Sequence, residues 1–107
     1  MNRSLSYCHP AAEIIYQTRK GISNEKTRIT IAYETTETTI KYQVACCAPH
    51  ENFSRKEGRD RALERFTATP ITLVPITTER ALDTIMGDIM ANHLPSRWIH
   101  ANLNVVK

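Results

Sequence analysis

The residues with the clearest chemical potential form a basic run in the middle of the chain. Between Phe53 and Phe66 the sequence reads FSRKEGRDRALERF. On a helix that turns about 100° per residue, Arg55, Lys56 and Arg59 fall within one sector at its start. The first backbone N–H groups of a helix have no partner within it, and the helix dipole is positive at that end. Cations gathered there can hold a phosphate or a carboxylate.

The same run contains its own start signal and its own counter-charges. Ser54 and Glu57 have the spacing of a capping box, in which each side chain satisfies a free backbone donor of the other. We therefore expect a helix that begins at Ser54 and runs to about Phe66. Glu57 also precedes Arg61 by four residues, the favourable order for a helix ion pair. A solvated, internally paired helix is thus the alternative to a binding face for nucleic acid or an acidic protein surface.

Sulfur and imidazole groups form a second set of candidates. Cys8 adjoins His9, and Cys46, Cys47 and His50 lie together further along the chain. Zinc would accept ligands from these groups, but their spacing fits no common zinc finger. Neighbours on a strand point to opposite faces, so we expect one of the adjacent cysteines in the core and the other outside. A Cys47–His50 nucleophile–base pair would still need a third, orienting group. We therefore expect no catalytic residue, no metal and no cofactor.

Composition limits the classes of protein that fit. The chain has 107 residues, of which 41% are hydrophobic and 23% charged, and this favours a single globular domain over residues 1–107. Its three glycines are too far apart for a dinucleotide-binding, P-loop or nucleophile-elbow motif. No apolar run approaches the roughly 20 residues that span a bilayer, and no signal peptide is evident. Three cysteines without a signal favour reduced thiols, so we expect a cytoplasmic protein away from membranes.

The positive charge is unevenly distributed. The formal net charge is +3, and the excess lies within the first 30 residues. This balance is too weak for a dedicated duplex binder and of the wrong sign for a DNA mimic. Four basic residues could extend a contact surface that starts on the helix: Arg19, Lys20, Lys26 and Arg28.

The segment that reads FSRKEGR, Phe53–Arg59, carries a resemblance. Together with the strand expected at Lys41–Cys47, it resembles a pattern found in small uncharacterised proteins of phages and prophages, and it covers about a quarter of the chain. The resemblance implies a phage or mobile-element accessory protein. Such a protein would inhibit or modulate a host nucleoprotein machine by stoichiometric binding, as anti-CRISPR and other anti-defence proteins do.

This resemblance sets the expected function and its rivals. The predicted partner is a host protein or nucleoprotein complex, with nucleic acid as a further possibility and a homodimer as a natural supplement at this size. The predicted partner-binding residues are Ser54, Arg55, Lys56, Arg59, Arg19, Lys20, Lys26 and Arg28. The alternatives are a nucleic-acid-binding regulator that uses the basic helix face, a small cysteine- or zinc-dependent enzyme, and a dimerising structural subunit.

The scaffold for these residues is expected to be α+β. Thr27–Tyr33 and Thr39–Cys46 alternate apolar and polar residues around a short polar stretch, which predicts an antiparallel hairpin. Thr69–Pro75, bounded by prolines, suits a sheet edge. The double apolar stripe of Thr78–Asn92 predicts a helix that covers the hairpin.

The two ends of the chain are less clearly patterned. Pro10 at a first turn and Gly21 past the end favour a helix over residues 10–17, although Ile14–Tyr16 would also suit a strand. Trp98–Ile99 and Val105–Val106 would supply a final packed segment. The expected fold is therefore an antiparallel hairpin or small sheet packed against two or three helices.

Overall fold

The computed structural model describes residues 5–104, and its architecture confirms the expected α+β fold. Six antiparallel strands form the sheet and two helices pack on it. In chain order the elements are β1 (Ser6–Cys8), β2 (Ala11–Thr18), β3 (Gly21–Thr35), β4 (Ile40–Cys46), α1 (Arg55–Ala68), β5 (Ile71–Leu73), α2 (Ala81–Asn92) and β6 (Trp98–Asn104).

The long strand β3 organises the sheet. The strand order is β5-β4-β3-β2-β6, and β1 pairs with the far part of β3 on the same edge as β2. Cys8 lies opposite Ile31 and Ala11 lies opposite Arg28, so β1 and β2 keep one register along β3. Across the gap between them, the Pro10 carbonyl accepts the Ile29 N–H at 3.1 Å. The two strands are in effect one strand, interrupted because proline has no N–H to donate.

The helix predicted over residues 10–17 is wrong, because this segment is strand β2. It pairs with β3 on one edge and with β6 on the other. Gly21, expected just past a helix end, has φ of 122° and follows the Arg19–Lys20 turn of the β2–β3 hairpin. Helix preferences among ordinary residues differ by less than about 0.7 kcal/mol each, so pairing on two edges outweighs them.

The other predicted elements are confirmed with shifted boundaries. The hairpin is β3 and β4, the basic helix is α1, and the proline-bounded segment contains edge strand β5. Helix α2 begins at Ala81 rather than Thr78, and its N-cap residue, Arg80, makes no side-chain cap bond. The final packed segment is β6, whereas the predicted contribution of Val105–Val106 lies outside the described residues.

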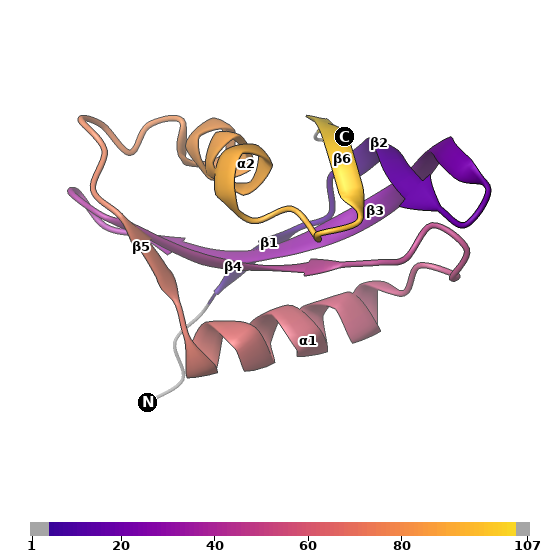
Figure 1. Ribbon diagram of the computed structural model, residues 1–107. Helices are drawn as coiled ribbons and strands as arrows, with labels where there is room; N and C mark the ends of the chain where they lie inside the picture. Colours follow the sequence, from indigo (N-terminus) through magenta and orange to yellow (C-terminus); the bar gives the residue numbers. More distant parts are fainter. Residues whose placement is uncertain (1–4, 105–107) are drawn as a thin grey trace.

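The two helices lie on opposite faces of the sheet (Figure 1). On the α2 face, Ile31 and Tyr42 of the sheet pack in one large core with Ile85 and Ile89 of the helix, and β6 contributes Trp98. This arrangement confirms that α2 covers the apolar face of the hairpin. On the α1 face a smaller cluster joins three alanines, Ala32, Ala45 and Ala62. The face that carries α1 is called the outer face below.

Close packing of α1 on the sheet depends on a glycine. A Cβ atom placed at Gly58 would overlap the hydroxyl of Thr30, a fully buried residue of β3. Because glycine has no side chain, the first turns of α1 can approach β3 closely. The start of the basic helix is thereby fixed directly above the middle of β3.

Candidate functional site

Helix α1 begins where the sequence predicts, but with half of the predicted capping box. The N-cap Ser54 is extended, and its Oγ accepts the Glu57 N–H at 3.3 Å. The Glu57 carboxylate instead accepts a bond from the Arg61 guanidinium at 2.9 Å. Ser54 therefore positions the helix start, while Glu57 neutralises a cation one turn further along.

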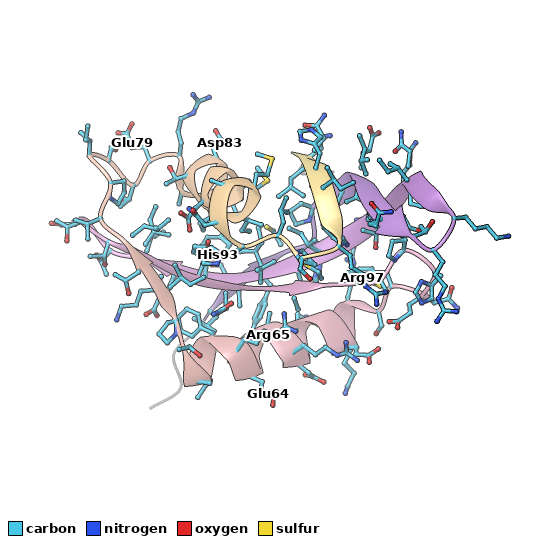
Figure 2. All side chains as sticks on the ribbon, in the orientation of Figure 1. Glu64, Arg65, Glu79, Asp83, His93 and Arg97 are labelled. Atoms are coloured by element: carbon cyan, nitrogen blue, oxygen red, sulfur yellow. The ribbon has the colours of Figure 1, made fainter. Side chains whose placement is uncertain are left out.

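Three of the cations on α1 are already engaged. Lys56 pairs with Asp60 at 3.3 Å and Arg61 pairs with Glu57, and both pairs are exposed. Arg65 donates from Nη1 to the Val44 carbonyl at 2.8 Å. Figure 2 shows Arg65 directed toward the sheet, whereas the adjacent glutamate points away from it. This part of the helix matches the internally paired alternative, and it leaves Lys56 exposed but paired with Asp60.

The remaining two helix arginines meet a third arginine from the sheet. Arg55 and Arg59 lie one turn apart at the start of α1, and Arg28 lies on β3. All three act electrostatically on His9, so their charges lie within electrostatic range of one side chain. We call Arg28, Arg55 and Arg59 the arginine cluster. Within residues 5–104, none of the three forms an ion pair with a carboxylate.

An aromatic ring holds the sheet arginine in place. The Arg28 guanidinium lies 5.9 Å from the centre of the Phe53 ring, a cation–π distance, and Arg28 also donates to the His9 carbonyl at 3.1 Å. The His9 and Phe53 rings meet edge to face at 5.4 Å between centres. Phe53, in the segment before α1, therefore contacts both β3 through Arg28 and the β1–β2 junction through His9.

His9 contributes no charge to the cluster at neutral pH. Its Nδ1 hydrogen-bonds the buried Thr30 hydroxyl at 2.9 Å. Burial lowers the pKa of His9 most, and the charges of Arg55, Arg59 and Arg28 lower it further. An anion bound between the guanidinium groups would offset these charges and favour the protonated imidazole.

The structure therefore divides the predicted binding residues into groups. Arg55 and Arg59 join Arg28, and Lys26 lies two residues from Arg28 on the same side of β3. Arg19 and Lys20 form the exposed turn at the far end of the hairpin, away from α1 (Figure 1). All three arginines are among the binding residues predicted from the sequence, whereas their grouping depends on the fold.

Two residues of the site were not assigned to it from the sequence. The sequence indicates His9 only as a candidate zinc ligand, and it does not indicate Thr30 as a site residue. Both enter the site because they face each other across the β1–β3 ladder. The alternation of residues 27–33 places Thr30 on the face opposite Ile29 and Ile31, and this is the signal by which Thr30 could have been found.

The cysteines separate as predicted for adjacent strand residues. Cys46 packs against the α2-side core, as does Cys8, and burial raises the pKa of each thiol to about 11. Cys47 faces the other way, and its Sγ lies 3.6 and 3.7 Å from the carbonyl oxygens of Ala48 and Glu51. Within residues 5–104, no group of three or more His, Cys, Asp or Glu side chains is arranged to hold a metal.

Two hollows border these elements. A cavity of about 30 Å³ lies beneath the start of α1, with Thr30, Phe53 and Gly58 among its lining residues, and has room for about one water molecule. A pocket of about 310 Å³ lies between the β4–α1 loop and the α2–β6 loop, where Tyr16 and Trp98 line it.

A separate polar network fastens α2 to the sheet. The Tyr42 hydroxyl donates to Asp88, and burial, reinforced by this bond, raises the pKa of Tyr42. His93 at the end of α2 lies 3.5 Å from the same carboxylate and edge-on to the Tyr42 ring (Figure 2). This network lies on the face opposite the arginine cluster and serves packing.

Comparisons with family models, curated proteins and solved structures found no match for this chain. Across residues 5–104, neither helix is long and apolar enough to cross a membrane. The arginine cluster is therefore the feature from which a function can be argued.

Proposed function

We propose that the protein is a phage or mobile-element accessory protein that inhibits or modulates a host nucleoprotein machine by stoichiometric binding. It acts by occupying a surface of that machine, in the manner of an anti-CRISPR or another anti-defence protein, and catalyses no reaction. The arginine cluster is its main contact surface.

One observation carries this proposal: Arg28, Arg55 and Arg59 come from two distant segments of the chain and have no carboxylate partner within residues 5–104. Bringing three cations together costs Coulomb energy unless an anion joins them. Guanidinium groups bind phosphates and carboxylates through paired N–H donors, and both groups are abundant on nucleoprotein surfaces.

A capture experiment tests the function and the contact surface together. Tagged protein is expressed in bacteria and recovered with and without nuclease treatment, and its partners are identified and quantified by mass spectrometry. We expect one defined complex at a fixed ratio of protein to partner that survives the nuclease. Inhibition of that complex's own activity in a purified assay completes the test.

The variant pair Arg55→Glu/Arg59→Glu and Lys56→Glu/Arg61→Glu locates the surface. Both double variants make the same charge change on the same helix. We expect the first to lose the complex and the second, which alters cations already paired within the helix, to retain most of it. Equal loss from both would overturn the assignment of the arginine cluster, and the absence of any defined complex would overturn the function.

A further inference from the structure

The outer face of the sheet has a second part that no helix covers. Helix α1 lies over the far part of β3 and over β4, whereas the β2–β3 hairpin extends beyond its start (Figure 1). On the hairpin and on β6, the outer-face side chains form cross-strand rows. These rows are Arg28–Ala11–Asn104, Lys26–Glu13–Asn102, Asn24–Ile15–His100 and Ile22–Gln17. We call the last three rows the open face.

The strand register places these side chains on one face of the sheet. The β2–β3 pairing runs from Ala11 to Thr18 without a shift, so every second residue keeps the same face. Thr30 and Arg28 mark the outer face at one end, because Thr30 meets α1 and Arg28 meets Phe53. The intervening residues of β2, such as Ile14, are fully buried in the α2-side core.

The open face has an unusual composition for an uncovered sheet. Four of its members are hydrogen-bonding side chains, namely the amides Gln17, Asn24 and Asn102 and the imidazole of His100, and each is exposed. Ile22 is 68% exposed and lies beside them without apolar cover. The single carboxylate, Glu13, stands directly opposite Lys26 on the neighbouring strand, so it adds no net negative charge to its row.

This surface is continuous with the arginine cluster. Arg28 belongs to the first row, and the six residues from there to Ile22 span roughly 20 Å of strand. One end of this combined surface therefore carries the three guanidinium groups, and Lys26 lies in the next row. Amide side chains and two isoleucines, Ile15 and Ile22, make up most of the remainder. The Arg19–Lys20 turn adds exposed cations at the far end.

We propose that the arginine cluster and the open face together bind a single strand of nucleic acid. The sugar–phosphate backbone lies on the arginine cluster and Lys26, and the bases lie on the open face. Amide side chains match the donor and acceptor edges of unpaired bases, and the exposed Ile22 and the partly buried Ile15 contact their flat faces. RNA and DNA share this chemistry.

The neutral amides favour this ligand over an acidic protein. A carboxylate surface would use the cations and could accept from the amide N–H groups, but it would leave the amide carbonyl oxygens and Ile15 of a row such as Asn24–Ile15–His100 without a matching partner. A duplex hides its base edges within grooves that usually receive a projecting helix or ribbon. This inference deepens the proposed function, because it names a nucleic-acid strand as the part of the host machine that the surface contacts.

Fluorescence anisotropy with the purified full chain tests the ligand class. The probes are labelled single-stranded RNA and DNA of the same mixed sequence and about 12 nucleotides, which is longer than the surface and within the usual range of binding-site sizes. Duplex DNA and a poly-glutamate peptide serve as competitors. We expect the single strands to bind at least tenfold more tightly than either competitor, and the RNA and DNA arms identify the source. Affinity should fall with salt with a log–log slope of about −2 to −3, as expected for three or four phosphate contacts.

Two matched variant pairs test the surface. Arg55→Gln/Arg59→Gln should weaken binding at least tenfold and reduce the salt slope by about 1.4, whereas Lys56→Gln/Arg61→Gln, with the same loss of charge, should change affinity less than about twofold.

Asn24→Asp/Asn102→Asp adds two charges to the open face with almost no change of shape. It should weaken binding by about tenfold, and Thr35→Asp/Thr38→Asp at the β3–β4 turn should have a smaller effect. Circular dichroism confirms that each variant is folded.

The outcomes separate this inference from the proposed function. Equal losses within either variant pair, or poly-glutamate that competes as well as the single strands, would overturn the strand-binding surface. If no oligonucleotide binds but a nuclease-resistant host complex is still captured, this inference fails while the proposed function stands. Oligonucleotide binding that depends on both patches, without any captured host complex, supports the surface and overturns the proposed function.

Discussion

The outer face of this sheet has two halves that one strand, β3, runs through. Beneath α1 the strand presents Thr30 and Ala32, and β4 adds Ala45, all three of them buried. Beyond α1 the same face of β3 presents Lys26 and Asn24, both exposed. Small side chains admit a helix, whereas amides and cations of greater length keep one away because burial would cost their hydration.

The border between the two halves lies at the start of α1, and two residues account for its position. Gly58 lets α1 approach Thr30, and Phe53 fills the space just before the helix against His9 and Arg28. The arginine cluster therefore lies on the border between the covered and the open half. Its guanidinium groups remain near solvent because the covering layer ends there.

An amide side chain, typical of the open half, should have the largest effect on the free energy of unfolding when it is placed in the covered half. Ala45→Asn places an amide beneath α1, where it overfills the small cluster and has no hydrogen-bond partner. We expect a loss of about 3 kcal/mol in the free energy of unfolding, measured by urea denaturation. Asn24→Ala in the open half should change this quantity by less than about 0.5 kcal/mol. Similar losses from both would mean that the halves do not differ in packing.

The two helix glycines provide the next test. Gly58→Ala forces the new methyl group against Thr30, and we expect a net loss of about 1–2 kcal/mol despite the better helix propensity of alanine. Gly87→Ala in α2 meets nothing within 4 Å and should gain up to about 1 kcal/mol. Thermal unfolding of both variants measures the contrast, and a stabilised Gly58→Ala protein would contradict the close approach of α1.

A smaller effect should appear in the titration of His9. Arg55→Gln/Arg59→Gln removes two of the charges that lower its pKa, so we expect the pKa of His9 to rise, as followed by NMR of the imidazole protons. In the native protein the folded pKa lies below the unfolded value of about 6.5, so the unfolded chain binds more protons below neutral pH. Stability therefore decreases as the pH falls through this range.

The stability of the double variant should decrease less steeply over the same range, because its folded pKa lies nearer the unfolded value. An unchanged pKa of His9 would show that the helix arginines point away from the border between the halves.

The smallest expected effect concerns the paired cations on the solvent side of α1. Lys56→Gln removes one exposed ion pair, and such pairs contribute less than about 1 kcal/mol. We expect a change in the free energy of unfolding below about 0.5 kcal/mol. A larger loss would mean that Lys56 has a structural contact beyond Asp60.

The sequence predicted the elements whose pattern is local. Alternation in Thr27–Tyr33 and Thr39–Cys46 located β3 and β4, and the S-x-x-E spacing located the start of α1, because each signal lies within one segment. Strand β2 carries helix signals instead, because Pro10 suits a first helical turn and Gly21 suits the position just past a helix end. Its identity depends on partners that lie elsewhere in the chain.

The candidate site shows the same limit. The sequence placed Arg55 and Arg59, together with Lys56, in one sector of the helix start, and it predicted Arg28 as a binding residue without placing it beside them. Their meeting depends on the β1–β3 register and on Gly58, which bring β3 beneath the helix start. The preference of Arg61 for Glu57 was visible as a spacing, and the structure confirms it.

The pairing of β6 with β2 has a consequence for how the chain is made. Ala11 lies opposite Asn104, so the first long strand meets its outer neighbour only after the last strand has left the ribosome. Until then the outer edge of β2 is an unpaired edge that can recruit other chains. Trp98, the single tryptophan of the sequence, is buried once β6 is paired with β2, so its fluorescence reports the docking of β6 on the sheet.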